Sequence, residues 1–379
     1  MVSSRVNGIN ESATVSMSNK AAELKAAGKT IYSFGIGEPD FTTPEEIIDY
    51  AFKEAREGKT HYTPSAGIME LREKIAEKMK KKNNIDATAS SVLVTPTKFS
   101  LNLALYSIID PGEEVLLPAP YYVSYPDIIK LNQGKMITVP TDENYEFDFQ
   151  EMKKYISPKT KAFMFNNPVN PTGKVYSEKS LRALADFILE NDLYLISDEI
   201  YEDLIYKGRM FSPGSIEEMK DKTVTLSGFS KSYAMTGWRI GYMVAPLDII
   251  KAANKVQQQT LTCAPSISQY GAMKALEDEE SVAKMRQEFA KRRDLTVSLL
   301  KEIDGITLYE PEGAFYAFPG YSTEKADDKL SMELLEKYNV IVTPGSPFGA
   351  PGHFRISYAT SQDVIREGIG RIEKYFNNL

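Results

Sequence analysis

Short apolar runs alternate with longer helical patterns along this chain from about residue 45. Six runs have the length and composition of buried strands: 91–94, 114–117, 136–139, 162–165, 193–196 and 223–226. Helical patterns separate several of them, over 70–82, 101–109 and 178–190. Because strands that are apolar throughout must be covered on both faces, this alternation predicts an α/β fold with a mostly parallel central sheet flanked by helices.

The last hundred residues follow a different pattern. A long charged helical stretch over about 277–303 leads to short strands near 315–318, 340–342 and 354–357, and then to a final helix. This order is typical of a smaller α+β domain. Because 379 residues exceed the size at which one hydrophobic core stops growing, we expect three parts: an N-terminal arm (1–44) that joins the small domain, a large domain (45–280) and a small C-terminal domain (281–379).

Composition argues against several classes of function. A net charge of −7 disfavours a nucleic-acid partner, which would require a basic face. One cysteine cannot form an internal disulfide, and with only two histidines the chain lacks the residues for a histidine–cysteine zinc site or a Ser-His-Asp hydrolase. There is no run of about 18 apolar residues and no apolar signal segment, so we expect a cytoplasmic protein without a membrane span.

Lys78 and the lysines at 80–82 end a helical pattern, and we expect solvent to surround them.

Lys231 follows the last predicted strand of the large domain, at the edge where parallel sheets bind ligands. Its neighbours are Ser, Gly, Phe, Tyr, Met and Trp, and no acid adjoins it. A lysine that forms imines must be partly desolvated, so that its amine can be neutral and nucleophilic. Eight residues later, Arg239 offers a planar fork that suits a phosphate. A lone lysine is usually a solvated surface residue, but this segment favours a reactive one.

Polar side chains follow three other predicted strands. Asp198 and Tyr201 follow one of them, and Asn170 lies in the turn-forming segment N-P-V-N-P-T-G that follows another. Thr97 and Lys98 join a third strand to a helix, an arrangement that directs backbone N–H groups at an anion. Structural alternatives remain open at this point: a helix-capping aspartate, a plain turn, or a solvated lysine.

Three further segments of the chain contain candidate residues: Tyr122, Arg355 and Gly37. Tyr122, in P-Y-Y-V-S-Y, follows a strand, although an aromatic residue in such a protein is usually part of the core. Arg355 lies among apolar and aromatic residues on a strand pattern near the C-terminus. If it is buried it must be paired, either in a structural ion pair or with the carboxylate of a ligand. Gly37 lies in G-I-G-E-P-D, and a G-x-G pattern alone assigns it no role.

The segment over 230–241 fits the pattern S-K-x-[YF]-x-M-x-G-W-R-x-G. It resembles the cofactor-lysine signature of class I aminotransferases, the pyridoxal 5′-phosphate (PLP) enzymes of fold type I related to aspartate aminotransferase. The other loops resemble the same family in the expected order, through G-x-G-E-P-D, P-Y-x-x-x-Y, N-P-T-G, S-D-E-I-Y and F-R-I-S. The likeness extends from Ser12-Ala13-Thr14 to the final helix.

The resemblance implies a role for each candidate. Lys231 would carry PLP as a Schiff base and act as general base, Asp198 would keep the pyridine nitrogen protonated, and Tyr201 would hydrogen-bond the phenolic oxygen. The other residues implied at the cofactor are Asn170, Tyr122, Thr97, Lys98, Ser230, Arg239 and Tyr62. The residues implied at the substrate are Arg355, which would hold the α-carboxylate, Gly37, Asn170, Tyr122 and Lys98.

The sequence departs from the family pattern at several places, and three of them bear on cofactor binding. Pro96 and Thr97 stand where the family usually has two glycines, so the phosphate site must depend on the Thr97 hydroxyl and on later amides. Gly228 stands where some relatives place a serine, which favours Ser230 as the phosphate-binding hydroxyl. Tyr122 replaces a common stacking tryptophan with a smaller ring.

The resemblance also implies substrates and a partner. A lysine at position 98 reads the distal carboxylate of an acidic substrate, which favours L-aspartate or L-glutamate as donor and a 2-oxo acid such as 2-oxoglutarate as acceptor. Aromatic amino acids or alanine, and a C–S β-lyase reaction, remain alternatives. Asn10 stands where relatives that accept prephenate carry a basic residue, so prephenate ranks below aspartate. Tyr62 matches a tyrosine that reaches the partner's cofactor phosphate, which implies a homodimer with shared active sites.

Overall fold

The computed structural model describes residues 2–11, 13–26 and 28–379, so that Ser12, where the family likeness begins, lies outside the described residues. Its centre is a seven-stranded sheet with the order β2-β8-β7-β6-β5-β3-β4. All neighbouring strands are parallel except at β8, which is antiparallel to both β7 and β2. The strands are β2 (Val92–Val94), β3 (Glu114–Pro118), β4 (Lys135–Val139), β5 (Thr160–Asn166), β6 (Tyr194–Asp198), β7 (Thr223–Gly228) and β8 (Gly241–Val244).

The predicted α/β fold with a mostly parallel sheet is confirmed. Each of the six predicted runs is a strand whose bounds differ by at most two residues from those expected. Strand β8 was not predicted, because its four residues follow directly on the lysine segment and have no turn signal of their own. It closes the gap between β2 and β7 and carries the chain away from the ligand edge.

Helices cover both faces of the sheet, which explains why the strands are apolar throughout. Along β3, Val115 and Leu117 belong to one hydrophobic cluster, whereas Leu116 points to the opposite one. The first face packs against α5 (Thr97–Ile108), α6 (Tyr125–Leu131) and α9 (Leu247–Thr260). The other face packs against α3 (Glu45–Arg56), α4 (Met69–Lys82), α8 (Glu178–Glu190) and α10 (Ser266–Ala275). Of the two short helices, α7 (Phe149–Met152) packs on the second face through Met152, and α1 (Ser4–Asn7) lies against α6.

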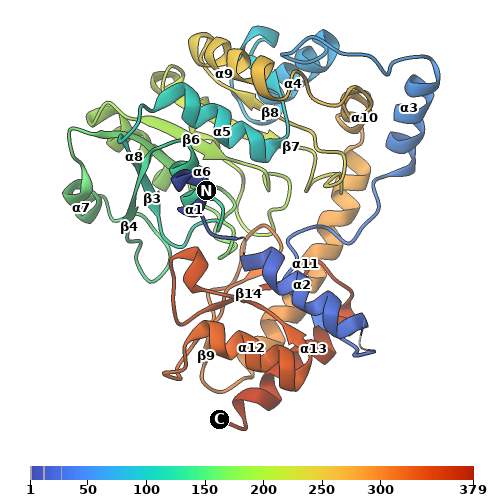
Figure 1. The fold of residues 1–379 in the computed structure, drawn as a ribbon, viewed down its shortest axis with the longest axis vertical. Helices are drawn as coiled ribbons and strands as arrows, with labels where there is room; N and C mark the ends of the chain where they lie inside the picture. The colour runs from blue at the N-terminus through green and yellow to red at the C-terminus, as the bar shows by residue number, and fades with distance from the viewer. Residues whose placement is uncertain (1, 12, 27) are drawn as a thin grey trace.

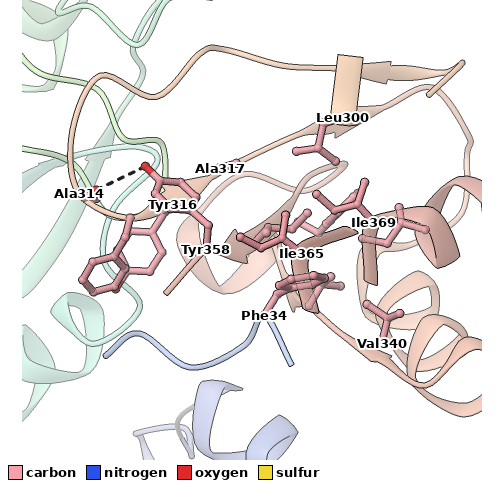
Figure 2. Packing of buried hydrophobic residues seen from close by; sticks show 14 of the residues in the cluster. Phe34, Leu300, Ala314, Tyr316, Ala317, Val340, Tyr358, Ile365 and Ile369 are labelled. Atoms are coloured by element: carbon pink, nitrogen blue, oxygen red, sulfur yellow. Dashed lines mark hydrogen bonds between the residues drawn. The ribbon is translucent and has the colours of Figure 1, made fainter. Parts of the chain in front are cut away.

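A second core forms around the C-terminal elements. The long helix α11 (Glu279–Lys301) runs from the sheet to these elements, and α2 (Ala13–Ala26) lies beside them (Figure 1). The buried cluster includes Phe34, Tyr316, Tyr358 and Ile365 (Figure 2). The remaining elements are β9 (Ile306–Thr307), β10 (Tyr316–Ala317), β11 (Gly320–Tyr321), α12 (Asp327–Tyr338), β12 (Val340–Ile341), β13 (Thr343–Pro344), β14 (Phe354–Ser357) and α13 (Gln362–Phe376).

The N-terminal segment joins this second core. Strand β1 (Tyr32–Ser33) pairs in parallel with β12, and Met17 and Ala21 of α2 pack with Leu335 and Ile341. The three-part division at residues 44 and 280 stays a prediction. Among the described residues, no helix is both long and apolar enough to cross a bilayer.

One prediction about solvation is wrong. The side chain of Lys78 on α4 is only 12% exposed, and its Nζ lies 2.6 Å from Glu202 Oε2. Position 78 follows Leu71 and Ile75, both buried, at helical spacing, so it falls on the face of α4 that packs against the sheet. Lys80 and Lys81 lie off that face and are 70% and 71% exposed, as expected.

Candidate active site

A cavity of about 450 Å³ opens where the carboxyl ends of β5, β6 and β7 approach the C-terminal elements. Its place follows from the topology, because parallel strands present their loops at one edge of the sheet. All the residues predicted for the site line this cavity except Tyr62. They are Gly37, Thr97, Lys98, Tyr122, Asn170, Asp198, Tyr201, Ser230, Lys231, Arg239 and Arg355.

Lys231 lies three residues beyond the end of β7 and is enclosed by protein rather than paired with an acid. Its Nζ donates a hydrogen bond to the carbonyl oxygen of Gly37 at 2.6 Å. The pKa of Lys231 is lowered to about 8, chiefly by burial; the charge of Glu38 opposes this shift, the positive charges of Arg355 and Arg239 add to it, and Asp198 opposes it weakly. A substantial fraction of the amine is therefore neutral near physiological pH. Glu38, which also lines the cavity, was given no role from the sequence.

Asp198 is the last residue of β6 and is 5% exposed. No helix begins there, so the alternative of a helix cap does not apply. Its Oδ2 accepts a hydrogen bond from the Tyr125 hydroxyl at 2.8 Å, and its Oδ1 accepts one from the Ile200 N–H at 3.3 Å. Burial raises the pKa of Asp198 to about 6, against these hydrogen bonds and the charge of Lys231. At pH 7 this carboxylate is mainly ionised and poorly solvated, which favours a cationic partner.

Arg355 on β14 is 1% exposed and has no carboxylate partner within the described chain. Its Nη1 donates to Asn170 Oδ1 and its Nη2 to the carbonyl oxygen of Gly35, both at 2.9 Å, while its Nε is buried without a partner. The guanidinium lies 4.5 Å from the ring centroid of Tyr316. The alternative of a structural ion pair therefore does not hold, and a buried positive charge faces the cavity.

Tyr201 and Tyr316 meet on the cavity wall. Their hydroxyl groups share a hydrogen bond at 2.7 Å, and both residues are almost fully buried. Tyr316 was not predicted, because it lies 115 positions from Tyr201 on a two-residue strand. Tyr125 was also missed, although its segment was noted; only the folded chain brings its hydroxyl to Asp198.

The Thr97 side chain fits between two glycines. Its Oγ1 donates to the carbonyl oxygen of Ser227 at 3.2 Å. A Cβ at Gly228 or at Gly241 would collide with the same Oγ1. Thr97 is the first residue of α5, after Pro96 in the N-cap position, so its hydroxyl and the helix N-terminus face the cavity together.

The remaining predicted residues occupy the rim. Arg239 has a φ of 55° and donates through Nη1 to the carbonyl oxygen of Thr236 at 2.8 Å. Lys98 is exposed, and its Nζ lies 5.8 Å from the ring centroid of Tyr122. Ser230 lies next to Lys231 on the cavity wall. Tyr62 is 88% exposed and does not reach the cavity of its own chain.

Comparisons with known proteins agree with this architecture. Residues 29–372 match the family of aminotransferase class I and II. A probable aspartate/prephenate aminotransferase of Aquifex aeolicus is 44% identical over 100% of this chain and 99% of that protein. Aromatic-amino-acid aminotransferase 2 of Thermococcus litoralis is 42% identical over 94% of each chain. The solved aspartate aminotransferase of Thermus thermophilus with maleate superposes with a TM-score of 0.95, at 39% identity and over 99% of each chain.

The chain belongs to the class I and II aminotransferase family. It is therefore a PLP-dependent transaminase with the fold of aspartate aminotransferase, as the resemblance predicted.

The donor set of the cavity fits PLP. A lysine that can become neutral, a buried carboxylate and a helix N-terminus next to an arginine suit its aldehyde, its ring nitrogen and its phosphate, respectively. The glycines at 228 and 241 leave room for the side chain of Thr97, which brings a hydroxyl to the helix N-terminus. The unpartnered Nε of Arg355 leaves a donor for a further anion.

Proposed function

We propose that this aminotransferase moves the amino group of L-aspartate, or of L-glutamate, to a 2-oxo acid such as 2-oxoglutarate. The observation that carries this proposal is a set of three cations at one cavity: Lys98, Arg239 and Arg355. None of them makes an ion pair within the part of the chain that the structure describes. A PLP phosphate and a dicarboxylic substrate together bring three anionic groups, and the charges are complementary.

Each cation has a setting that suits one of these groups. Arg355 is buried and rigidly held by two neutral oxygens, which suits the α-carboxylate that every amino acid carries. Arg239 lies near the N-terminus of α5, the position for the phosphate. Lys98 is exposed at the rim beside Tyr122, where it would bind the distal carboxylate of aspartate. The Aquifex relative, whose name includes aspartate, supports this choice.

The chain's own groups then divide the proton chemistry. Bound PLP supplies the sink for the electrons that the substrate's Cα releases. Lys231 Nζ, whose pKa is near 8, removes the Cα proton and holds it for return. Asp198, ionised in a poorly solvated setting, keeps a proton on the ring nitrogen. Tyr201 and Asn170 would donate to the phenolic oxygen, Gly37 would present its backbone to the substrate, and Tyr122, Thr97 and Ser230, which line the same cavity, would complete the cofactor's contacts.

We also propose that the protein is a homodimer with shared active sites. Tyr62 is 88% exposed in the single chain, although tyrosine normally buries its ring. Exposed apolar side chains occur also at Ile36, Met69 and Tyr106. Full activity in a dilute monomer would contradict this part of the proposal.

We retain the cytoplasm as the proposed location, since the chain has only one cysteine.

The test is the absorption spectrum of the purified protein with PLP, before and after addition of L-aspartate without any oxo acid. We expect loss of the visible band and release of one equivalent of oxaloacetate. Lys98→Met should raise the KM for aspartate about 10-fold or more, with little change for phenylalanine. Conversion by phenylalanine or alanine but not by aspartate would contradict the choice of substrate. A band that persists in Lys231→Ala would contradict the role of Lys231.

A further inference from the structure

Tyr316 contacts three parts of the site at once. Its hydroxyl shares the 2.7 Å hydrogen bond with Tyr201, and its ring lies beneath the guanidinium of Arg355. A Cβ on Gly37 would approach the same hydroxyl to 2.6 Å, so the backbone that accepts from Lys231 passes directly over it. Tyr316 therefore lies between the groups proposed for the cofactor and those proposed for the substrate.

The ring of Tyr316 is held firmly. It is 1% exposed and packs in the C-terminal hydrophobic cluster with Tyr358 and Ala314 (Figure 2). Phe315 and Tyr201 contact it at centroid distances of 4.8 and 5.7 Å. Because the ring is fixed, only the hydroxyl proton of Tyr316 can still move, by rotation of the O–H group.

We propose that Tyr316 is a positioning residue for the transamination reaction, which orients the Tyr201 hydroxyl by donating a hydrogen bond to it. This inference rests on the proposed function, in which Tyr201 serves the phenolic oxygen of PLP.

The direction of the hydrogen bond follows from counting protons. A tyrosine hydroxyl has one proton to donate and can accept hydrogen bonds through its lone pairs. When Tyr201 gives its proton to an oxygen in the cavity, it can only accept from Tyr316. Tyr316 then donates, and a hydroxyl that accepts one hydrogen bond becomes a stronger donor for the next. The charged and titratable groups around the pair are Arg355, Lys231, Tyr122 and Tyr358, and Asp198 lines the same cavity. Against the effect of burial, the positive charge of Arg355 acts to lower the pKa of Tyr316, which favours Tyr316 as the donor.

Removal of the Tyr316 hydroxyl has a predictable effect. In Tyr316→Phe the ring beneath Arg355 remains, so the KM for aspartate should stay within about twofold of the wild-type value. Tyr201 becomes a weaker donor, and the oxygen that it serves becomes more basic. The pH midpoint of the visible band of the holoenzyme should therefore rise by about 0.4 to 1 pH unit, which corresponds to one hydrogen bond. The kcat should fall about 2- to 10-fold.

Tyr358→Phe is the matched control. Tyr358 is a buried tyrosine of the same cluster, and its hydroxyl donates to the carbonyl oxygen of Ala314 at 3.4 Å, away from the cavity. It should leave the pH midpoint unchanged, whatever its effect on thermal unfolding. In a Tyr201→Phe background, Tyr316→Phe should add no further shift, since the group that it orients is absent.

The outcomes separate this inference from the proposed function. If Tyr316→Phe converts aspartate with an unchanged midpoint, or if Tyr358→Phe shifts the midpoint equally, the positioning role is wrong and the proposed function stands. An additional shift in the Tyr201→Phe background would also overturn the role. If the wild-type protein shows no band that depends on Lys231, the proposed function itself fails.

Discussion

Lys78 and Lys231 are both largely removed from solvent, but their surroundings act on their charges in opposite ways. Burial alone would lower the pKa of Lys78, but the Glu202 carboxylate at 2.6 Å raises it well above its usual value. Burial lowers the pKa of Lys231 to about 8, and its close partner is a neutral carbonyl oxygen, that of Gly37. The comparison shows that the partner, rather than the loss of solvent, decides whether a buried lysine remains a fixed cation.

The two settings correspond to two tasks. The Glu202 carboxylate is held by further hydrogen bonds from Asn83 and Ser227, at 2.6 and 2.5 Å, so the Lys78 pair is part of a fixed polar network. Lys231 opens onto a cavity and makes no ion pair among the described residues, so that the charges of Glu38 and Asp198 only partly offset its burial. The ion pair of Lys78 holds α4 against the sheet. The amine of Lys231, which has no such pair, can exchange a proton with a substrate.

The largest expected effect is on stability, at the Lys78 pair. Lys78→Met leaves the Glu202 carboxylate buried without its cation, which should lower the free energy of unfolding by about 3–5 kcal/mol in denaturant titration. Lys80→Met, two positions along the same helix, breaks an exposed pair with Asp86 and should cost less than about 1 kcal/mol. Lys78→Met combined with Glu202→Leu should recover much of the loss. Equal effects of the two single variants would mean that Lys78 is solvated after all.

The next effect concerns the reactivity of Lys231 in the ligand-free protein. Because only the neutral amine attacks an aldehyde, modification should increase as the pH rises through about 8, the pKa of Lys231, rather than through 10.5. The measurement is reductive trapping with a small aldehyde over a pH series, read at Lys231 by mass spectrometry. A short lysine peptide in the same tubes gives the reference curve. Coincidence of the two curves would contradict the desolvated setting.

The smallest expected effect is on the pKa of Lys231, when the negative charge of Glu38, which raises this pKa, is removed. Glu38 is the main group that raises the pKa of Lys231, and its Oε2 accepts a hydrogen bond from Thr236 Oγ1 at 2.9 Å. Glu38→Gln keeps an acceptor but removes the charge, so the trapping midpoint of Lys231 should fall by less than about one pH unit. Thr236→Val removes the hydrogen bond and keeps the charge, and the midpoint should hardly move. A larger change in Thr236→Val would assign the effect to geometry instead of charge.

The sequence predicted those site residues that follow strands within contiguous motifs. Lys231, Asp198 and Asn170 each come shortly after an apolar run, and parallel topology alone places such loops at one edge. Arg355 was predicted as a candidate, but its lack of a carboxylate partner required the folded chain, because its neighbours Asn170 and Gly35 lie 185 and 320 positions away.

What the sequence did not predict are pairings between distant side chains. Tyr316 and Tyr125 are aromatic residues in apolar surroundings, and nothing local distinguishes a core tyrosine from one whose hydroxyl reaches Tyr201 or Asp198. Lys78 was mistaken for a surface lysine because its partner, Glu202, lies on another part of the chain. Strand β8 was missed because its four residues follow directly on the lysine segment, without a turn signal of their own.

Because Thr97 packs between Gly228 and Gly241, the order in which substitutions at these three positions can be accepted during evolution is limited. A side chain at 228 or 241 cannot be added while the Thr97 hydroxyl occupies the space, so either gain would be selected against in this background. Replacement of Thr97 by glycine removes this clash, but a Cβ at 228 would still lie 2.8 Å from the Cα of Gly241, so the backbone must also shift before a serine fits there. The three positions are therefore epistatic: the cost of a side chain at 228 or 241 depends on which residue occupies position 97.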